Sequence, residues 1–166
     1  MPTYVAEFVE ELRRQGADRL GRELMYPVLV LSGVAGTLRD QNRPGTLVTD
    51  LNETLTLSRL VGRVFPLVKR KDSPPGPIAV GRSSDNDVAI SDYSISQRHC
   101  HLNLSGPQTI LTDCGSTNGT VVDGRPAPAR QPVALQGGET LVLGRFAFLF
   151  MRPNGFLDYL RSQAAK

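Results

Sequence analysis

From residue 78 onward, short apolar runs alternate with turn residues, and this pattern limits the fold more than any other feature. The runs occupy residues 78–80, 88–90, 99–104, 109–111, 120–122, 133–135, 141–143 and 146–151. Between them stand Asn118-Gly119, Asp123-Gly124 and Gly137-Gly138, dipeptides typical of tight turns between strands. The intervals leave no room for the helices that connect parallel strands. We therefore predict a mainly β chain, folded as a β-sandwich.

Composition indicates a folded domain and excludes several functional classes. The 166 residues are 40% hydrophobic and 21% charged, as in globular proteins. A net charge of +3 and the absence of Trp argue against nucleic-acid binding. No apolar run approaches the roughly 20 residues that span a bilayer, and the acidic N-terminus does not resemble a secretory signal. Because the two cysteines, Cys100 and Cys114, have no paired spacing, we expect a cytoplasmic protein without disulfides.

The first 56 residues predict a helix followed by irregular chain. Apolar residues recur at helical spacing at Val5, Phe8, Val9, Leu12 and Leu20. Pro27 marks the end of this pattern, and glycine, proline and asparagine indicate irregular structure over residues 32–52. A strand-like run follows over residues 60–68. We therefore divide the chain into an N-terminal extension (1–56), a sandwich (57–152) and a C-terminal helix (153–166).

The last apolar run is apolar on both faces of the strand that it predicts. One face carries Phe146, Phe148 and Phe150, and the other carries Ala147, Leu149 and Met151. The outer face of a sandwich strand normally contacts water. We therefore expect a helix to cover this strand, either the N-terminal helix or the short amphipathic helix after Pro153.

Three polar clusters lie at the ends of predicted strands and combine groups that bind phosphate. They are Gly81-Arg82, residues 94–99 and residues 113–120. An arginine offers a two-point contact with phosphate oxygens, and serine and threonine hydroxyls add donors. Consecutive backbone N–H groups in the glycine-containing turn at 115–119 could add an anion-binding nest. Each cluster alone is more typical of an ordinary solvated turn.

In their order and spacing, these motifs resemble the forkhead-associated (FHA) domain family. The resemblance covers roughly residues 60–151 and includes Gly81-Arg82, Asp87–Ile90, Ser94-Ile95-Ser96-x-x-His99, Asp113-x-Gly115-Ser116-Thr117-Asn118-Gly119-Thr120, Asp123-Gly124 and Gly137-Gly138-Glu139. It implies a sandwich of about eleven strands whose apical loops bind phosphothreonine peptides. It implies neither catalysis nor a cofactor.

The resemblance also implies roles for individual residues. Arg82 matches the family arginine that pairs with the phosphate, and Ser96 matches a serine whose hydroxyl meets it. Thr117 matches the residue that contacts the phosphothreonine, and Asn118 matches the asparagine that holds the peptide backbone. Gln97 stands where the family often has Asn, Arg or Lys, so it brings no charge. The residues expected to support the loops are Gly81, His99 and Gly119.

Other chemistries fit these residues less well. His99 and His101 could begin a metal site, but zinc requires three or four ligands. Ser96, His99 and Asp113 suggest a hydrolase triad, but no Gly-x-Ser-x-Gly elbow accompanies them. We therefore expect no enzyme activity, no metal and no cofactor.

Two hypotheses of function remain. The first is a phosphothreonine-recognition module in Ser/Thr-kinase signalling, whose partner is a phosphothreonine-containing protein such as a kinase or its substrate. The alternative is a structural assembly subunit that uses the sandwich for phosphate-independent contacts. Under the first hypothesis, peptide selectivity is expected in residues 123–130, where Arg125 would favour acidic side chains.

Overall fold

The computed structural model describes residues 2–34 and 56–166 of the chain. Its helices are α1 (Val5–Gln15), α2 (Ala17–Glu23) and α4 (Pro153–Ala164). Its strands are β1 (Val28–Val34), β2 (Val64–Pro66), β3 (Ile78–Gly81), β4 (Val88–Ala89), β5 (Cys100–Asn103), β6 (Thr109–Asp113), β7 (Thr120–Val122), β8 (Arg125–Pro126), β9 (Pro132–Leu135), β10 (Thr140–Leu143) and β11 (Phe146–Met151). In this described part, no helix is both long and apolar enough to cross a bilayer. The mainly β class with terminal helices is confirmed.

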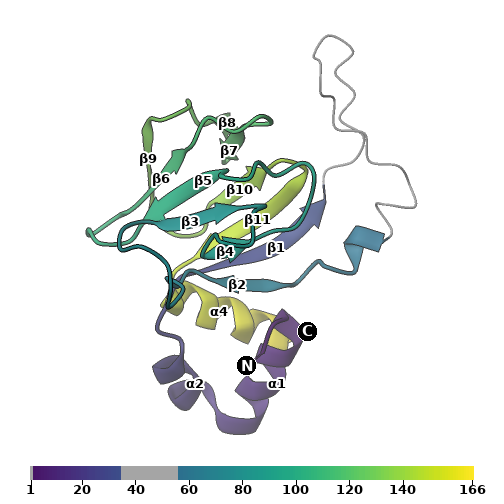
Figure 1. Cartoon of the computed structure of the whole chain (residues 1–166). Helices are drawn as coiled ribbons and strands as arrows, with labels where there is room; N and C mark the ends of the chain where they lie inside the picture. The colour runs from purple at the N-terminus through teal and green to yellow at the C-terminus, as the bar shows by residue number, and fades with distance from the viewer. Residues whose placement is uncertain (1, 35–55) are drawn as a thin grey trace.

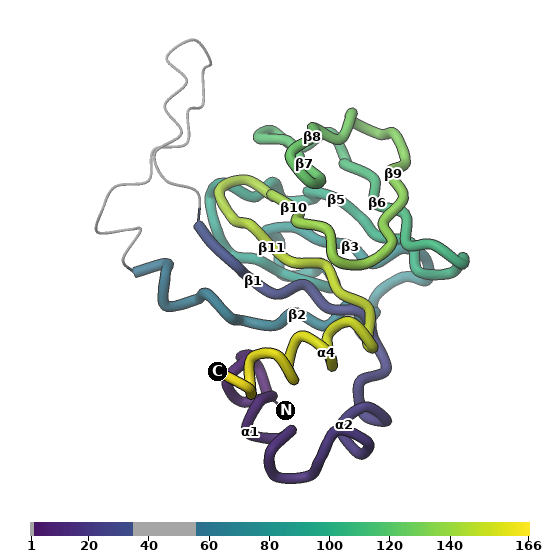
Figure 2. The backbone as a smooth tube through the Cα atoms, turned by 180° about the vertical axis from the view of Figure 1, so that it is seen from behind, coloured from purple at the N-terminus to yellow at the C-terminus, as the bar shows by residue number. Residues whose placement is uncertain are grey.

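The strands form two stacked sheets, and the helices add a third layer beneath one of them (Figure 1). A six-stranded sheet has the order β2-β1-β11-β10-β7-β8, and a five-stranded sheet has the order β4-β3-β5-β6-β9. The predicted sandwich of about eleven strands is therefore confirmed. The two chain termini lie close together in the helical layer in both views (Figures 1 and 2).

An apolar core fills the space between the sheets. The six-stranded sheet contributes alternate residues of its central strands, and the five-stranded sheet contributes one or two from each strand. The most deeply buried of them are Leu29, Val80, Leu102, Leu111, Leu135, Leu141, Leu143, Phe148 and Phe150. This core holds the strand ends in fixed positions, and so it positions the loops between them.

A second apolar cluster lies between the six-stranded sheet and the helices. Val28, Val30 and Met151 face outward from the sheet and pack with residues of α1 and α4. The rings of Phe8 and Phe156 meet edge to face, with centroids 5.2 Å apart. The expectation that a helix covers the apolar outer face of the last strand is therefore confirmed, and both candidate helices contribute.

Strand β1 differs from the sequence expectation. Residues 1–56 were expected to be an extension outside the sandwich, but β1 lies between β2 and β11 inside the six-stranded sheet. The apolar run at 28–31 shows no alternation because both faces of β1 are buried, and such a run is difficult to classify by periodicity. Of the segment expected to be irregular, residues 32–34 belong to β1 and residues 35–52 lie outside the described residues.

Two other expectations need correction. The strand expected over residues 60–68 is limited to β2, because the chain turns at Gly62, where φ is 93°. Asp123-Gly124 joins the paired strands β7 and β8 as expected. In contrast, Asn118-Gly119 and Gly137-Gly138 each connect strands of different sheets. Hairpins and crossovers both use positive φ angles, so the dipeptide alone does not distinguish them.

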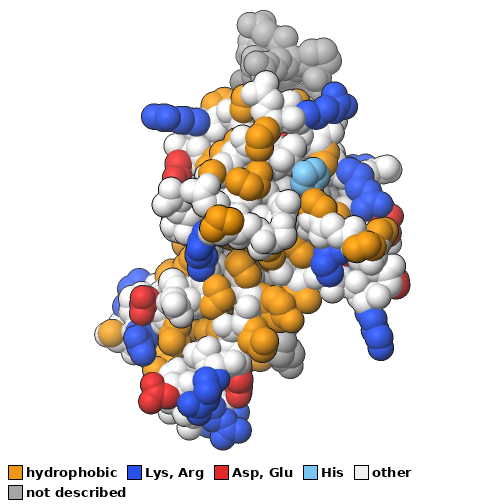
Figure 3. Space-filling view, turned by 90° about the vertical axis from the view of Figure 1, so that its left-hand side faces the viewer, with side chains coloured by type: hydrophobic (Ala, Val, Ile, Leu, Met, Phe, Trp, Pro, Cys, Tyr) orange, Lys and Arg blue, Asp and Glu red, His pale blue; other side chains and the backbone are white. Residues whose placement is uncertain are grey.

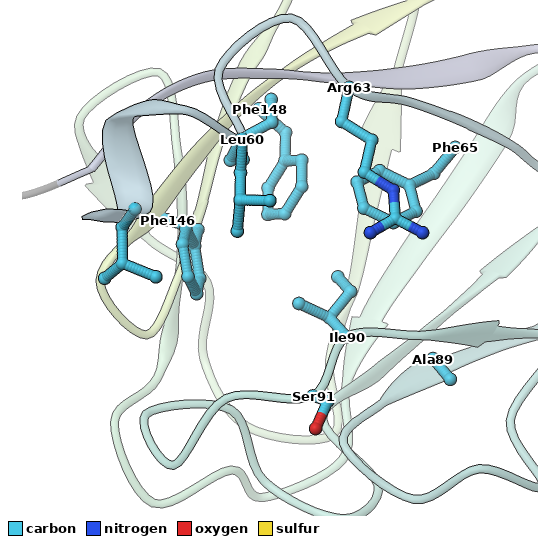
Figure 4. Close-up of a pocket in the computed structure, with 10 residues that line it drawn as sticks. Leu60, Arg63, Phe65, Ala89, Ile90, Ser91, Phe146 and Phe148 are labelled. Carbon is cyan, nitrogen blue, oxygen red and sulfur yellow. The ribbon is translucent and has the colours of Figure 1, made fainter. Parts of the chain in front are cut away.

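An apolar cavity of about 240 Å³ opens at the edge of the sandwich (Figure 4). Most of its lining is aliphatic or aromatic, from Leu31, Leu57, Leu60, Phe65, Ala89, Ile90, Phe146 and Phe148. Its charged residue, Arg63, lies over the Phe65 ring, with Cζ 5.0 Å from the ring centroid. The lining offers few hydrogen-bond donors, so this cavity is a poor match for a phosphate.

Candidate functional site

Three loops at one end of the strands bring the predicted site residues together. They follow β3, precede β5 and follow β6. The backbone N–H of Arg82 donates to the Ser96 carbonyl at 2.9 Å, which joins the first loop to the second. The backbone N–H of Thr117 donates to Ser96 Oγ at 2.9 Å, which joins the third. Ser96 therefore lies at the centre of the candidate site.

Arg82, whose backbone contacts Ser96, is exposed. Across residues 2–34 and 56–166, no carboxylate pairs with it. The neighbouring Arg98 is different, because it bonds Asp85 Oδ2 at 2.6 Å and Asn86 Oδ1 at 3.0 Å. Arg98 is thus neutralised by the loop after β3, whereas Arg82 is available to an incoming anion.

Gly81 and Asn86 hold the first two loops against each other. Asn86 is fully buried, and its Nδ2 donates to the carbonyls of Ser83 and Gln97 at 2.8 Å each. A Cβ on Gly81 would lie 2.2 Å from the Gln97 carbonyl oxygen, so the close approach requires glycine. The Gln97 side chain itself is exposed. The role of Asn86 was not predicted from the sequence, because a buried asparagine in a polar loop has no distinctive spacing.

His99 joins the second loop to the third through both ring nitrogens. The Ser96 N–H donates to Nδ1 at 3.1 Å, so Nε2 carries the hydrogen and donates to the Gly119 carbonyl at 3.0 Å. This assignment requires the neutral ring. Burial lowers the pKa of His99, although the Gly119 carbonyl and Asp113 oppose that shift. The expected role of His99, to support the loops without touching the ligand, stays a prediction.

Asp113 organises the third loop from inside. Its carboxylate accepts the N–H groups of Gly115 and Ser116 at 2.9 and 3.0 Å, and the Thr120 hydroxyl at 2.7 Å. Burial alone would raise the pKa of Asp113, but the hydrogen bonds outweigh it and lower the pKa. These N–H groups are occupied. Gly115 and Ser116 therefore offer no free backbone N–H to the anion-binding nest expected over residues 115–119.

Side chains of the loops also offer donors to an anion. Ser96 Oγ accepts the Thr117 N–H, so its own hydrogen is free to point toward a ligand. Thr117 is exposed and adds a second hydroxyl to the site. One guanidinium with two hydroxyls can bind a doubly charged, three-oxygen group.

Asn118 has a bond that the sequence did not indicate. Its Nδ2 donates to the Ser94 carbonyl at 2.9 Å, which anchors the third loop to the segment before β5. Within the described residues no other bond to the amide is found, so its oxygen is available to a peptide N–H. Asn118 can therefore support the loop and bind a peptide backbone at the same time.

A buried ion pair beneath Asn118 was missed by sequence reasoning. Arg145 and Asp92 meet at 2.5 Å, with side chains only 5% and 7% exposed. Ser94 Oγ donates to Asp92 Oδ2 at 2.6 Å and accepts the Arg145 N–H at 3.1 Å. Burial opposes ionisation of Asp92, but the bonds from Arg145 and Ser94 lower its pKa. The β10–β11 turn thereby positions the segment that carries Ser96, and no local motif encodes a pair 53 residues apart.

The geometry does not assemble the alternative chemistries. His99 bonds the Ser96 backbone N–H and not its hydroxyl, and Asp113 bonds the third loop, so these three residues do not form a triad. Within the described residues, no cluster of three or more His, Cys, Asp or Glu residues could hold a metal ion. Cys100 and Cys114 are free thiols, and burial raises the pKa of Cys100.

Comparisons with known proteins agree with this geometry. A family model described as FHA domain matches residues 78–144, which include all three loops. Residues 78–144 therefore match the FHA domain family. Two of the relatives have the names of an inhibitor and a regulator. The oxoglutarate dehydrogenase inhibitor of Corynebacterium jeikeium is 33% identical over 73 residues, 44% of this chain and 49% of that protein.

Two further relatives differ in how much of their own length the match covers. The glycogen accumulation regulator GarA of Mycolicibacterium smegmatis is 32% identical over 73 residues, 44% of each chain. The ABC transporter ATP-binding/permease protein Rv1747 of Mycobacterium tuberculosis is 30% identical over 112 residues, 68% of this chain but 12% of that protein. The match thus spans about half of the smaller regulators and a small part of the transporter.

Proposed function

We propose that this chain is a non-enzymatic recognition module that binds phosphothreonine peptides at the Arg82–Ser96–Thr117 loops. The observation that carries the proposal is the exposed, unpaired Arg82 guanidinium, joined through its backbone to Ser96, whose hydroxyl hydrogen is free. Asn118 would hold the peptide backbone from the same loop. Gln97 would contribute an uncharged amide at most.

The proposed setting is Ser/Thr-kinase signalling in the cytoplasm. The FHA match and the names of two relatives, an inhibitor and a regulator, support an adaptor or sensor role over catalysis. A phosphothreonine carries about −1.5 to −2 charges at neutral pH, so its creation by a kinase would switch the interaction on. The proposed partner is a phosphothreonine-containing protein, such as a kinase or its substrate.

The test is calorimetry with phosphothreonine peptides selected from a library and their unphosphorylated counterparts. Wild type should bind only the phosphorylated forms. Arg82→Ala should lose on the order of 2–5 kcal/mol of binding free energy, because the phosphate would lose its paired charge. Arg82→Lys should also weaken binding, since an ammonium lacks the two-point fork. Affinity should fall below about pH 6, where the phosphate loses charge.

Arg125→Ala is the matched control, because it removes one exposed arginine elsewhere in the FHA domain. It should retain wild-type phosphate dependence. If no phosphothreonine peptide binds wild type better than it binds Arg82→Ala, the proposed function is wrong.

In that event the assembly-subunit hypothesis gains weight, and one observation favours it. Met25 and Tyr26 are 71% and 47% exposed where α2 leads into β1. They border a concavity of about 260 Å³ that also includes Phe8, Leu20 and Val28. Figure 3 shows hydrophobic side chains gathered on this side, where the helical layer meets the sheets.

A further inference from the structure

Arg130 has an unusual backbone conformation at the start of β9. Its φ is +61°, and of the residues described only Asp123 is another non-glycine with a positive φ. Asp123 belongs to an Asp-Gly hairpin turn, where this conformation is common. Arginine lacks the short polar side chain that lets asparagine and aspartate adopt the left-handed region at low cost, so this backbone conformation is unfavourable for Arg130. Contacts with the surrounding structure must therefore stabilise this backbone conformation of Arg130.

The contacts of Arg130 place it against the third site loop. Its backbone N–H donates to the Asp113 carbonyl at 2.8 Å, at the end of β6. Its guanidinium lies over Gly115, the first glycine of that loop. A Cβ on Gly115 would be 3.2 Å from Nη2 and 3.5 Å from Cζ. Gly115 is two residues before Thr117, so Arg130 contacts the loop that is proposed to bind phosphothreonine.

The Arg130 charge is available at this position. The residue is exposed, and within residues 2–34 and 56–166 no carboxylate pairs with its guanidinium. Arg98 and Arg145, by contrast, are both bound by carboxylates of this chain. The first loop thus carries one exposed arginine, Arg82, and Arg130 adds a second positive charge against the third loop at Gly115. Gln97 in the second loop is exposed but neutral.

We propose that Arg130 determines peptide specificity by binding an acidic side chain, Asp or Glu, that flanks the phosphothreonine. The inference rests on the proposed function, since it assigns a second contact to the same peptide. It also moves the expected acid-selective residue from Arg125 to Arg130. Arg125 borders a separate concavity with Asp123 and Glu139, away from the Gly115 loop.

The experiment measures the affinity of phosphothreonine peptides in which one Asp is placed in turn at each flanking position. Each peptide is compared with its Asn counterpart, which has the same shape without the charge. Wild type should prefer Asp at one position by about two- to fivefold, the range of an exposed ion pair. Arg130→Asn should remove this preference but keep phosphate dependence. Asparagine tolerates a positive φ, so the backbone should keep its conformation.

Arg125→Asn is the matched control and should keep the full Asp preference. Arg130→Glu should reverse the preference, so that Lys at the same peptide position becomes favourable. The inference is overturned if wild type binds phosphothreonine peptides without an Asp preference, or if Arg130→Asn retains it. If wild type binds no phosphothreonine peptide at all, the proposed function is wrong as well. In the two preceding outcomes wild type still binds phosphothreonine peptides, so the failures are distinguishable.

Discussion

The helical layer and the site loops are held together by different kinds of contact. Between the helices and the six-stranded sheet, Phe8, Phe156 and their neighbours form a continuous apolar cluster. In the loops, Asn86, His99 and Asp113 are buried as well, but each is held by directed hydrogen bonds. Apolar packing tolerates some exchange of side chains, whereas a hydrogen-bonded loop depends on the position of each donor and acceptor.

Because of this difference, we expect the helical layer to determine the stability of the fold and the site loops to determine the binding of a ligand. The helical layer buries area that contributes to the free energy of unfolding, but it does not include the site residues. The loops leave Arg82, Ser96 and Thr117 available to a ligand while the buried polar residues hold them in place. Substitutions in the two regions should therefore affect different measurements.

The largest expected effect is on the stability of the helical layer. Phe156 is fully buried between α1 and the sheet. Phe156→Ala should lower the free energy of unfolding by about 3–5 kcal/mol, because it removes a large apolar group and leaves a cavity. Urea denaturation measures this loss. Calorimetry at a temperature where the variant is folded should show wild-type phosphopeptide affinity, and a parallel loss of affinity would contradict the separation of the two regions.

A smaller effect on stability, with an effect on binding, is expected at Gly81. Gly81→Ala would place a Cβ 2.2 Å from the Gln97 carbonyl oxygen, which is backbone and cannot rotate away. The loops must separate, so we expect a loss of about 1–3 kcal/mol in unfolding free energy and weaker peptide binding. Gly106→Ala is the control, because its nearest atom would be 3.7 Å away. Equal behaviour of the two variants would refute the role of Gly81.

The smallest expected effect is a pH dependence of stability from His99. The folded protein holds its pKa below the ordinary value of 6.5 because the ring is buried. As pH falls below 6.5, the unfolded chain takes up a proton that folded His99 resists, so the free energy of unfolding decreases until the folded pKa is reached. Urea denaturation between about pH 7 and pH 5 measures this slope, and His99→Gln should reduce it. Identical slopes in both proteins would show that His99 is not held neutral.

Much of the fold follows from periodicity. The short runs after residue 78 correspond to strands, and the helical spacing at 5–12 corresponds to α1. Both of these patterns are local, since one buried face imposes one period. The run at 28–31 has no such period, because β1 is buried on both faces between β11 and β2. Its place in the sheet depends on strands far away in the sequence.

The candidate site shows the same division. The sequence predicted Arg82, Ser96, Thr117 and Asn118 as site residues, because their order and spacing resemble those of the FHA domain family. The Asp92–Arg145 pair had no such signal, since neither residue is distinctive where it stands. The sequence also did not predict that Asp113 accepts the N–H groups of Gly115 and Ser116, because a turn motif does not show which acceptor each N–H group will bind.

The sequence alone determined the helix over residues 5–12, the strands after residue 78 and the residue types that meet at one end of the sandwich. These properties depend on local patterns of apolar, glycine and hydroxyl residues. The tertiary structure decided which residues and strands contact each other. It places β1 between β2 and β11, pairs Arg98 with Asp85, and brings Arg130 into contact with Gly115. Partner choice depends on distances between residues remote in the chain, and only the folded sandwich brings those residues together.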